Sequence, residues 1–402
     1  MANVSSSNGI EKYPKLRFPE FTEPWKTTHL CKLFKKNTQK NSASTVTNVI
    51  CNSAKNGLIP QKDYFDKDIA NADNTAGYYI ISKNDFVYNP RKSADAPYGP
   101  ISRYTYDEDG IVSPLYLCFR GTKNVNPEYF ERYFRSAVWH RYIYMSGDSG
   151  ARHDRVSIKD ETFFEMPVKL PNDKEQDKIA RFLSLIEKKI EVQAALVDDL
   201  KKYKRGVETI LLEGEYFNKG NAIRTCLGDV CSFFSGGTPS SGNSSYYGGN
   251  IPFIRSGEIH SEHTELQLTE LGLKNSAAKM VARGDLLLAL YGATSGEVDI
   301  SKIDGAINQA ILCIRPDAIN KIYLKHLLSY NKTNIINTYL QGGQGNLSAE
   351  IIKGLYFDIP DSHIQNEVST ILDTLDKRIN YAESQKSTLD LLKKGLLQQL
   401  FI

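Results

Sequence analysis

The chain contains one internal repeat, which limits its fold more than any other feature. The segment from Pro171 to Leu211 returns 189 residues later as Pro360 to Leu400, without a gap. Identical residues pair at Pro171 and Pro360, Gln176 and Gln365, Leu183 and Leu372, Lys188 and Lys377, Ile190 and Ile379, Leu200 and Leu389, Lys204 and Lys393, and Gly206 and Gly395. In each copy a proline precedes a long apolar pattern with a helical period. The chain is therefore predicted to have two halves, each ending in a long helix.

Apolar residues within each copy alternate spacings of three and four, which is the a/d seam of a coiled coil. The seam positions are Ile179, Leu183, Ile186, Ile190, Val197, Leu200 and Val207 in the first copy, and Val368, Leu372, Leu375, Ile379, Leu389, Leu396 and Leu400 in the second. A helix of about 60 Å is longer than an ordinary domain covers, so we expect the two helices to pair and bury most of each seam. Lysines at seam positions (Lys204, Lys386 and Lys393) are expected to fix the register or to mark a surface for another protein.

Each helix follows a globular segment that mixes short predicted strands, turns and helices. The predicted fold is α+β with a pseudo-twofold internal repeat: a disordered arm at 1–13, a first head at 14–165, a first long helix at 166–213, a linker at 214–222, a second head at 223–354 and a second long helix at 355–402. If the two helices are antiparallel, the heads lie inverted at opposite ends of a rod. Inverted heads at a fixed separation match inverted half-sites on duplex DNA.

Composition argues against a secreted or membrane protein. The 402 residues, 41% of them hydrophobic, are enough for two domains and a connector. The N-terminus lacks a signal pattern, and the longest apolar run, Leu286 to Tyr291, has the length of a strand rather than of a membrane span. Six scattered cysteines without a C-x-x-C pair favour a reducing cytoplasm. The net charge of +3 neither favours nor excludes nucleic acid.

One stretch of the first head concentrates basic and aromatic residues. Five arginines alternate there with aromatic side chains: Arg132, Arg135, Arg141, Arg152 and Arg155 among Tyr133, Phe134, Trp139, Tyr142 and Tyr144. A surface that contacts phosphates and bases would need such a pattern. A solvated helix face with its aromatic residues buried would give the same pattern, and both interpretations remain open.

Glycine-rich turns follow the predicted strands of the second head. Their glycines permit close approach of backbone to a ligand, and the adjoining Ser, Thr, Asn and Gln can contact base edges and phosphates. Each turn taken alone is more often only a turn. The candidate DNA-contacting residues of both heads are Arg103, Arg120, Arg152, Arg155, Ser235, Thr238, Arg255, Ser256, Tyr291, Thr294, Gln309, Gln341, Gln344 and Asn346.

Motifs for catalysis on nucleotides are missing. An adenine-amino methyltransferase needs an N-P-P-Y-type motif, but Asn89-Pro90 is followed by Arg91, and Asn126-Pro127 is followed by Glu128. No G-x-x-x-x-G-K-[ST] is present, so ATP is not bound here by a P-loop. The chain is predicted to be non-catalytic.

Two weaker patterns, one nuclease-like and one metal-like, have ordinary structural explanations. The nuclease-like E-x-K at Glu187 to Lys189 is expected on the exposed side of the heptads, as ordinary surface charge. His260 and His263 could contact a metal, but a surface loop is favoured because no third ligand adjoins them. The sequence therefore predicts no metal site.

Several motifs together resemble the specificity (S) subunit of type I restriction-modification systems. They are the two-copy plan, Leu16-Arg17-Phe18-Pro19 with Trp25, S-G-G-T-P at 235–239, Y-Y-G-G-N-I-P at 246–252, L-Y-G-A-T-S-G at 290–296, Asn308-Gln309-Ala310 and N-L-S at 346–348. The match is specific in the second head and in both long helices. It is weak in the first head, whose loops do not repeat those of the second.

The resemblance implies that each head is a target recognition domain for one half of a bipartite DNA site. The helices would set the spacing and dock two methyltransferase subunits, and a restriction subunit would add ATP-dependent translocation and cleavage. Adenine-N6 methylation from S-adenosylmethionine would belong to the partners, so this chain would bind no cofactor itself, and ATP and Mg²⁺ would also act in the partners. The alternatives are a coiled-coil scaffold with two protein- or glycan-binding heads and, less favoured, a single-chain nuclease.

Overall fold

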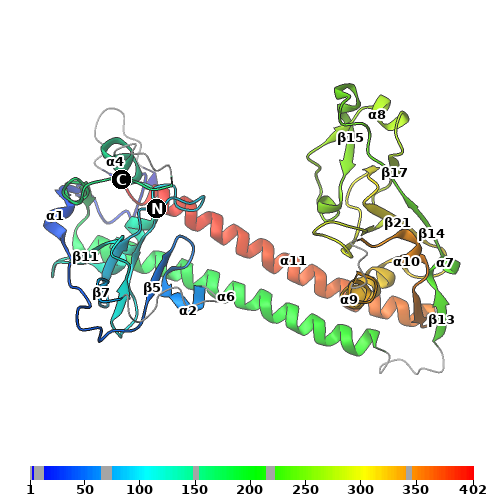
Figure 1. Cartoon of the computed structure of the whole chain (residues 1–402), viewed down its shortest axis with the longest axis horizontal. Helices are drawn as coiled ribbons and strands as arrows, with labels where there is room; N and C mark the ends of the chain where they lie inside the picture. The colour runs from blue at the N-terminus through cyan, green and yellow to red at the C-terminus, as the bar shows by residue number, and fades with distance from the viewer. Residues whose placement is uncertain (1, 4–12, 65–74, 148–153, 214–221, 341–345) are drawn as a thin grey trace. The chain divides into compact units, whose positions relative to one another are not determined.

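The computed structural model describes residues 2–3, 13–64, 75–147, 154–213, 222–340 and 346–402 (Figure 1). The chain folds as two compact units: unit 1 comprises Met1–Ala194 and Ser384–Ile402, and unit 2 comprises Ala195–Glu383. Two long helices, α6 (Asp173–Leu212) and α11 (Ser362–Gln399), each begin in one unit and end in the other. The arm at 1–13 and the linker at 214–222 fall almost entirely outside the described residues.

Unit 1 contains the first head, built on a four-stranded antiparallel sheet of order β4-β11-β8-β9. Smaller pairs are β1-β2, β3-β12, β5-β6 and β7-β10. The elements are β1 (Ala2–Asn3), β2 (Leu16–Arg17), β3 (Lys26–His29), α1 (Leu30–Leu33), β4 (Phe34–Lys36), β5 (Ile50–Ser53), β6 (Gly57–Pro60), α2 (Gln61–Tyr64), β7 (Tyr79–Ile81), β8 (Asp85–Tyr88), β9 (Ile101–Arg103), β10 (Gly110–Val112), β11 (Leu117–Gly121), α3 (Pro127–Arg135), α4 (His140–Ser146), α5 (Asp160–Phe164) and β12 (Pro167–Leu170).

Unit 2 contains the second head, built on two four-stranded sheets of order β14-β21-β18-β19 and β16-β15-β20-β17. A further pair, β13-β22, precedes α11. The elements are β13 (Ile223–Cys226), α7 (Leu227–Val230), β14 (Cys231–Ser235), η3 (Ser244–Tyr246), β15 (Tyr247–Ile254), η4 (Ser256–Glu258), β16 (Gln267–Leu268), α8 (Glu270–Lys274), β17 (Lys279–Val281), β18 (Leu286–Ala289), β19 (Val298–Ile300), β20 (Gly305–Ile307), β21 (Ile311–Pro316), α9 (Lys321–Leu340), α10 (Ala349–Lys353) and β22 (Tyr356–Ile359).

The two heads share one scaffold, although their sequences show no repeat. The sheet β4-β11-β8-β9 has the same strand order as β14-β21-β18-β19, and the last strand of each head pairs with an early one, β12 with β3 and β22 with β13. A bidentate ion pair also recurs: Arg120 donates to both carboxylate oxygens of Asp85, and Arg315 does the same with Asp285. The internal repeat therefore covers the heads as well as the helices.

The same hydrogen bond is present at the start of both long helices. The side-chain amide of Gln176 donates to the carbonyl of Pro171, and that of Gln365 donates to the carbonyl of Pro360. Strands β12 and β22 come directly before these prolines, so 166–172 and 355–361 are strand and turn, and the helices are shorter than the predicted 166–213 and 355–402.

The long helices keep the predicted seam residues away from solvent in each unit. Every seam residue named above is buried or half-buried, while the intervening helix positions are mostly exposed. The helices run antiparallel in unit 1, where Glu187 pairs with Lys393, and in unit 2, where Lys204 pairs with Asp376. Because Asp376 and Lys393 are the repeat counterparts of Glu187 and Lys204, these two ion pairs are the same contact made twice.

The expectation that the partner helix covers most of each seam needs a correction. Ile179 and Leu183 belong to the core of the first head, together with the aromatic residues of its sheet. Val368, Leu372 and Leu375 belong in the same way to the core of unit 2. The heads therefore bury the start of the helix that follows them. Seam lysines are neutralised by acids, since Lys386 also pairs with Asp390 along its own helix.

The segment from Lys15 to Trp25 at the start of the first head, called the strap below, is anchored to α6. Arg17 donates to both oxygens of Glu175 at 2.7 Å, and the indole of Trp25 also donates to Glu175. All three side chains are buried. A buried carboxylate without such partners would be costly, so Glu175 ties the strap to the first turn of the helix.

Candidate nucleic-acid interface

The second head gathers its polar turns at one edge of a sheet. Ser235, at the end of β14, lies across from Leu312 at the start of β21, which in turn pairs with Leu288 near the end of β18. The turns after β14 and β18 and before β21 therefore meet. The hydroxyl of Thr238 donates to the side-chain carbonyl of Gln309 at 2.5 Å, which joins two of these turns.

Close backbone contacts explain why glycine occurs in these turns. A Cβ on Gly236 would lie 1.8 Å from the carbonyl oxygen of Ile307, so no other residue fits there. Gly292 has a φ of +92°, and a Cβ on it would lie 3.7 Å from the hydroxyl of Ser256. Gly236 therefore lets the turn after β14 lie against β20, and Gly292 lets the turn at 290–296 adopt a left-handed conformation beside Ser256.

The candidate DNA-contacting residues of the second head differ in their solvent exposure. Thr238, Gln309 and Asn346 are exposed, while Ser235, Arg255, Ser256, Tyr291 and Thr294 are half-buried. Next to Asn346, the backbone N–H of Leu347 donates to the carbonyl of Leu290, so this segment reaches the same edge. Gln341 and Gln344, and Arg152 of the first head, lie outside the described residues.

Arg255 is held by two carboxylates. It donates to Glu258 at 3.1 Å and to Glu265 at 2.5 Å. Hydrogen bonds from these two acids raise the pKa of the guanidinium further above its usual value. A DNA phosphate would therefore have to displace a carboxylate to reach this charge.

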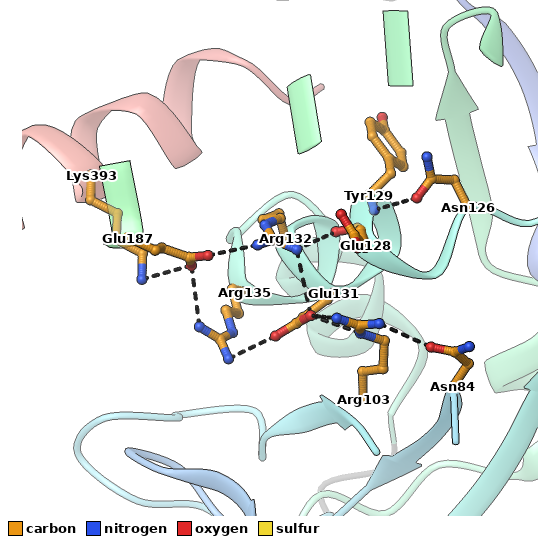
Figure 2. Close-up of polar contacts among 10 residues, drawn as sticks. All are labelled: Asn84, Arg103, Asn126, Glu128, Tyr129, Glu131, Arg132, Arg135, Glu187 and Lys393. Carbon is orange, nitrogen blue, oxygen red and sulfur yellow. Dashed lines mark hydrogen bonds and ion pairs between the residues drawn. The ribbon is translucent and has the colours of Figure 1, made fainter. Parts of the chain in front are cut away.

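Arg103 and Arg120 of the first head are likewise engaged. Figure 2 shows the guanidinium of Arg103 between Glu131, at 2.8 Å, and the side-chain oxygen of Asn84. Arg120 makes the bidentate pair with Asp85 described above. Both stay candidates for DNA contact, but in this structure their charges are already balanced.

The predicted arginine-rich and aromatic surface is wrong for α3 and Trp139, whereas Arg141 and Tyr144 on α4 are exposed. Tyr133, Phe134 and Trp139 lie in the core of the first head, so they cannot stack on bases. Arg132 is also buried, with 7% of its side chain exposed, and donates to Glu187 at 2.7 Å. For α3 and Trp139 the interpretation with buried aromatic residues is correct, although Arg132 is not solvated.

Glu187 is the centre of an ion-pair cluster, formed with Arg132, Arg135 and Lys393 (Figure 2). Burial opposes ionisation of Glu187, but Lys393 and the two arginines outweigh it and lower the pKa of the carboxyl. The expectation that the E-x-K residues face solvent is therefore wrong for Glu187, because three cations from α3 and α11 surround it.

His260 has carboxylate neighbours in the second head. Its ring contacts Asp299 at 2.9 Å and Glu297 at 3.5 Å. The hydrogen bond to Asp299 raises the pKa of the imidazole. Within the described residues, no group of three His, Cys, Asp or Glu side chains is arranged to hold a metal ion.

Sequence reasoning missed one basic cluster in the first head. Arg91 forms an isolated antiparallel bridge with Arg155, and of the two only Arg155 is among the candidate DNA-contacting residues named above. Lys92 follows directly and lines the same pocket. The adjacent basic residues of Asn89-Pro90-Arg91-Lys92 were the sequence signal for this cluster. The segment was compared above only with the methyltransferase motif, which it does not fit.

None of the helices in the described residues is long and apolar enough to span a membrane. Comparison with known proteins finds a family model that matches part of the chain. Residues 224–389 match the family model described as type I restriction modification DNA specificity domain.

Curated relatives carry related descriptions. The specificity subunit of the type I restriction enzyme MjaIX from Methanocaldococcus jannaschii is 27% identical over 186 residues, which are 43% of this chain and 42% of that protein. The EcoR124I/EcoR124II specificity subunit from Escherichia coli is 22% identical over 235 residues, 56% of this chain and 58% of that protein. The chain thus spans about half the length of these relatives.

A solved structure has the same fold over nearly the whole chain. The S subunit of a type I restriction-modification system from M. genitalium has a TM-score of 0.60 at 15% identity and covers 97% of this chain and 99% of its own. The α+β plan with two long helices and the resemblance to the specificity subunits are confirmed. Nothing in these matches favours the scaffold with protein- or glycan-binding heads.

Proposed function

We propose that this chain, which carries a type I restriction modification DNA specificity domain, is the non-catalytic subunit that selects the DNA target of such a system. Each head recognises one half of a bipartite DNA site. The observation that carries the proposal is the repeated architecture: two heads of one scaffold, each followed by a long helix of the same repeat. Two copies of one recognition module suit a target with two half-sites.

The partner subunits supply the chemistry. Two methyltransferase subunits transfer a methyl group from S-adenosylmethionine to the N6 of adenine, and restriction subunits use ATP and Mg²⁺. None of these cofactors is assigned to this chain. Six free cysteines and a DNA target support a cytoplasmic location.

Exposed apolar side chains on the long helices support the docking of two like partners. Unit 1 exposes Val192 on α6 and Leu392 on α11, and unit 2 exposes Tyr381 on α11 and Tyr203 on α6. Tyr381 is the repeat counterpart of Val192, and Leu392 is the counterpart of Tyr203. Each unit therefore presents an equivalent apolar pair, as two copies of one methyltransferase subunit would need.

Footprinting of the purified complex tests the proposal. The complex of this chain with its methyltransferase subunits should protect two short stretches of DNA separated by an unspecified gap. From about 60 Å of helix, at 3.4 Å per base pair, the total reach should not exceed about 17 base pairs. Protection of one short contiguous site would contradict two independent heads.

A further inference from the structure

Two arginines of the first head face each other across a β-bridge. Arg91 and Arg155 are antiparallel partners, at positions where side chains lie on the same face with their Cβ atoms about 5 Å apart. Like charges directly opposite each other destabilise a strand pair. Among the described residues the closest carboxylate to Arg155 is that of Asp154, at 3.8 Å and largely exposed, which makes it a weak partner.

These arginines line a pocket of about 490 Å³. Lys92 lines it too, and the described residues of its wall include three cations and no carboxylate. The lining also includes the hydroxyl groups of Ser53 and Ser113. A pocket with this lining suits an oxyanion, which both neutralises the cations and accepts hydrogen bonds from guanidinium groups.

Backbone hydrogen bonds hold the cations in place. The side chain of Asn89 accepts from the N–H of Arg91 and donates to the carbonyl of Asn52, which fixes the loop to β5. The N–H of Lys92 donates to the carbonyl of Asp154, and that of Val156 donates to the carbonyl of Pro90. The backbone positions of the three basic residues are therefore fixed by the fold before any ligand binds.

We propose that this pocket, formed by Arg91, Lys92 and Arg155, binds a backbone phosphate of the DNA target. The inference rests on the proposed function and deepens it by naming where the first head holds the DNA backbone. Phosphate contacts position a protein on the duplex, whereas contacts to base edges select the sequence. The pocket contributes affinity and orientation but does not choose the half-site.

The second head lacks such a cluster at the matching place. The turn at 290–296, which follows β18 as the turn at 89–100 follows β8, contains no basic residue. Arg255, at the same edge, is held by Glu258 and Glu265. The phosphate pocket is thus a property of the first head.

Salt-dependent DNA binding tests the assignment. The variant R91Q/K92Q/R155Q is compared with the wild type, each in complex with the methyltransferase subunits, on a duplex that carries the target. Loss of one phosphate contact should reduce the magnitude of the slope of log K against log salt by about one. The methylated motif should stay the same. Lys26→Gln, an exposed lysine on β3 outside the pocket, is the matched control and should leave the slope unchanged.

The outcomes distinguish a failure of the pocket assignment from a failure of the proposed function. An unchanged slope in a folded triple variant overturns the pocket assignment, and so does an altered first half-site, which would mean that the residues contact bases. Arg155→Lys, which keeps the charge, should retain most of the slope if the triple variant folds poorly. Stabilisation of the wild type by inorganic phosphate, with no difference in DNA binding between the two proteins, would assign the pocket to a free phosphate instead. Failure of the wild-type complex to bind DNA refutes the proposed function itself.

Discussion

At the scale of single residues, the two units place different side chains at matching positions. Asn126 and Asn320 cap α3 and α9. Each also donates to the long helix that begins in its unit, Asn126 to Asp177 on α6 and Asn320 to Asn366 on α11. Six residues after each cap stand Arg132 and His326. Arg132 reaches Glu187, whereas His326 is fully buried, and neither of its ring nitrogens has a hydrogen-bond partner within the described residues.

His326 should make unit 2 sensitive to acid. Burial, reinforced by Lys325, lowers the pKa of its imidazole from 6.5 to about 3. Between these values the unfolded chain binds the proton more readily than the folded one, so stability falls as the pH decreases through this window. The loss is at most about 1.4 kcal/mol per pH unit.

Unfolding measurements from pH 7 to pH 4.5 on the wild type and on His326→Leu check this. The variant should lose less stability on acidification, because it lacks the titrating group. His363, which is exposed on α11, provides the control as His363→Leu, which should behave as the wild type does. Equal acid sensitivity of His326→Leu and the wild type would contradict the assignment.

Glu187 gives a second prediction at this scale. Replacing Glu187 by Gln should destabilise unit 1 by about 3 kcal/mol, because buried Arg132 loses its charged partner. Since the pKa of this carboxyl is lowered, its contribution is present above the ordinary value of 4.5 and is lost as the pH falls through the lowered one. Glu191→Gln, exposed on the same helix, should cost almost nothing in chemical denaturation. Similar losses in the two variants would show that the cluster is not stabilising.

At the scale of elements, the helices could be predicted from sequence and the heads only in part. A heptad pattern depends on the spacing of apolar residues within one segment, so Ile179 to Val207 revealed the seam directly. The common scaffold of the heads depends on strand pairings far apart in sequence. The ion pairs of Arg120 with Asp85 and of Arg315 with Asp285 form only after folding. No local sequence pattern therefore indicates that the two heads share a scaffold.

The candidate contact residues show the same limit. Sequence indicated that the turns at 235–238 and 290–296 are polar and glycine-rich, and the structure brings them to one edge. The sequence did not indicate that Arg103, Arg120 and Arg255 are paired with carboxylates. Those partners, Glu131, Asp85 and Glu265, follow from tertiary packing and not from residue type.

The exposed apolar pairs on α6 and α11 predict the stoichiometry of the complex. Val192→Glu with Leu392→Glu should release one methyltransferase subunit, and Tyr203→Glu with Tyr381→Glu should release the other. The reason is that a buried glutamate lacks a partner in an apolar interface. Native mass spectrometry of the co-purified complex measures this.

Lys189→Glu, a charge change at an exposed position of α6, is the control and should keep both partners. A folded chain with all four substitutions that still holds two methyltransferase subunits would rule out this docking surface.

At the scale of the whole molecule, the helices are proposed to set the distance between the half-sites. Inserting one heptad into both α6 and α11 keeps the phase of the seam while lengthening each helix by about 10 Å. The unspecified spacer should then grow by about three base pairs, and both half-sites should stay the same. Methylation mapping of the variant measures the spacer. A change in the half-site sequences would mean that the helices do not determine spacing alone.

The most direct test of the central claim is single-molecule methylation sequencing of a plasmid from cells that carry this chain with its methyltransferase subunit. Cells with the methyltransferase subunit alone provide the comparison. The proposed function predicts methyladenine in two short half-sites with a fixed unspecified gap, only in cells that carry this chain. Identical methylation in both strains, with both proteins present and assembled, would contradict the role of this chain in selecting the DNA target.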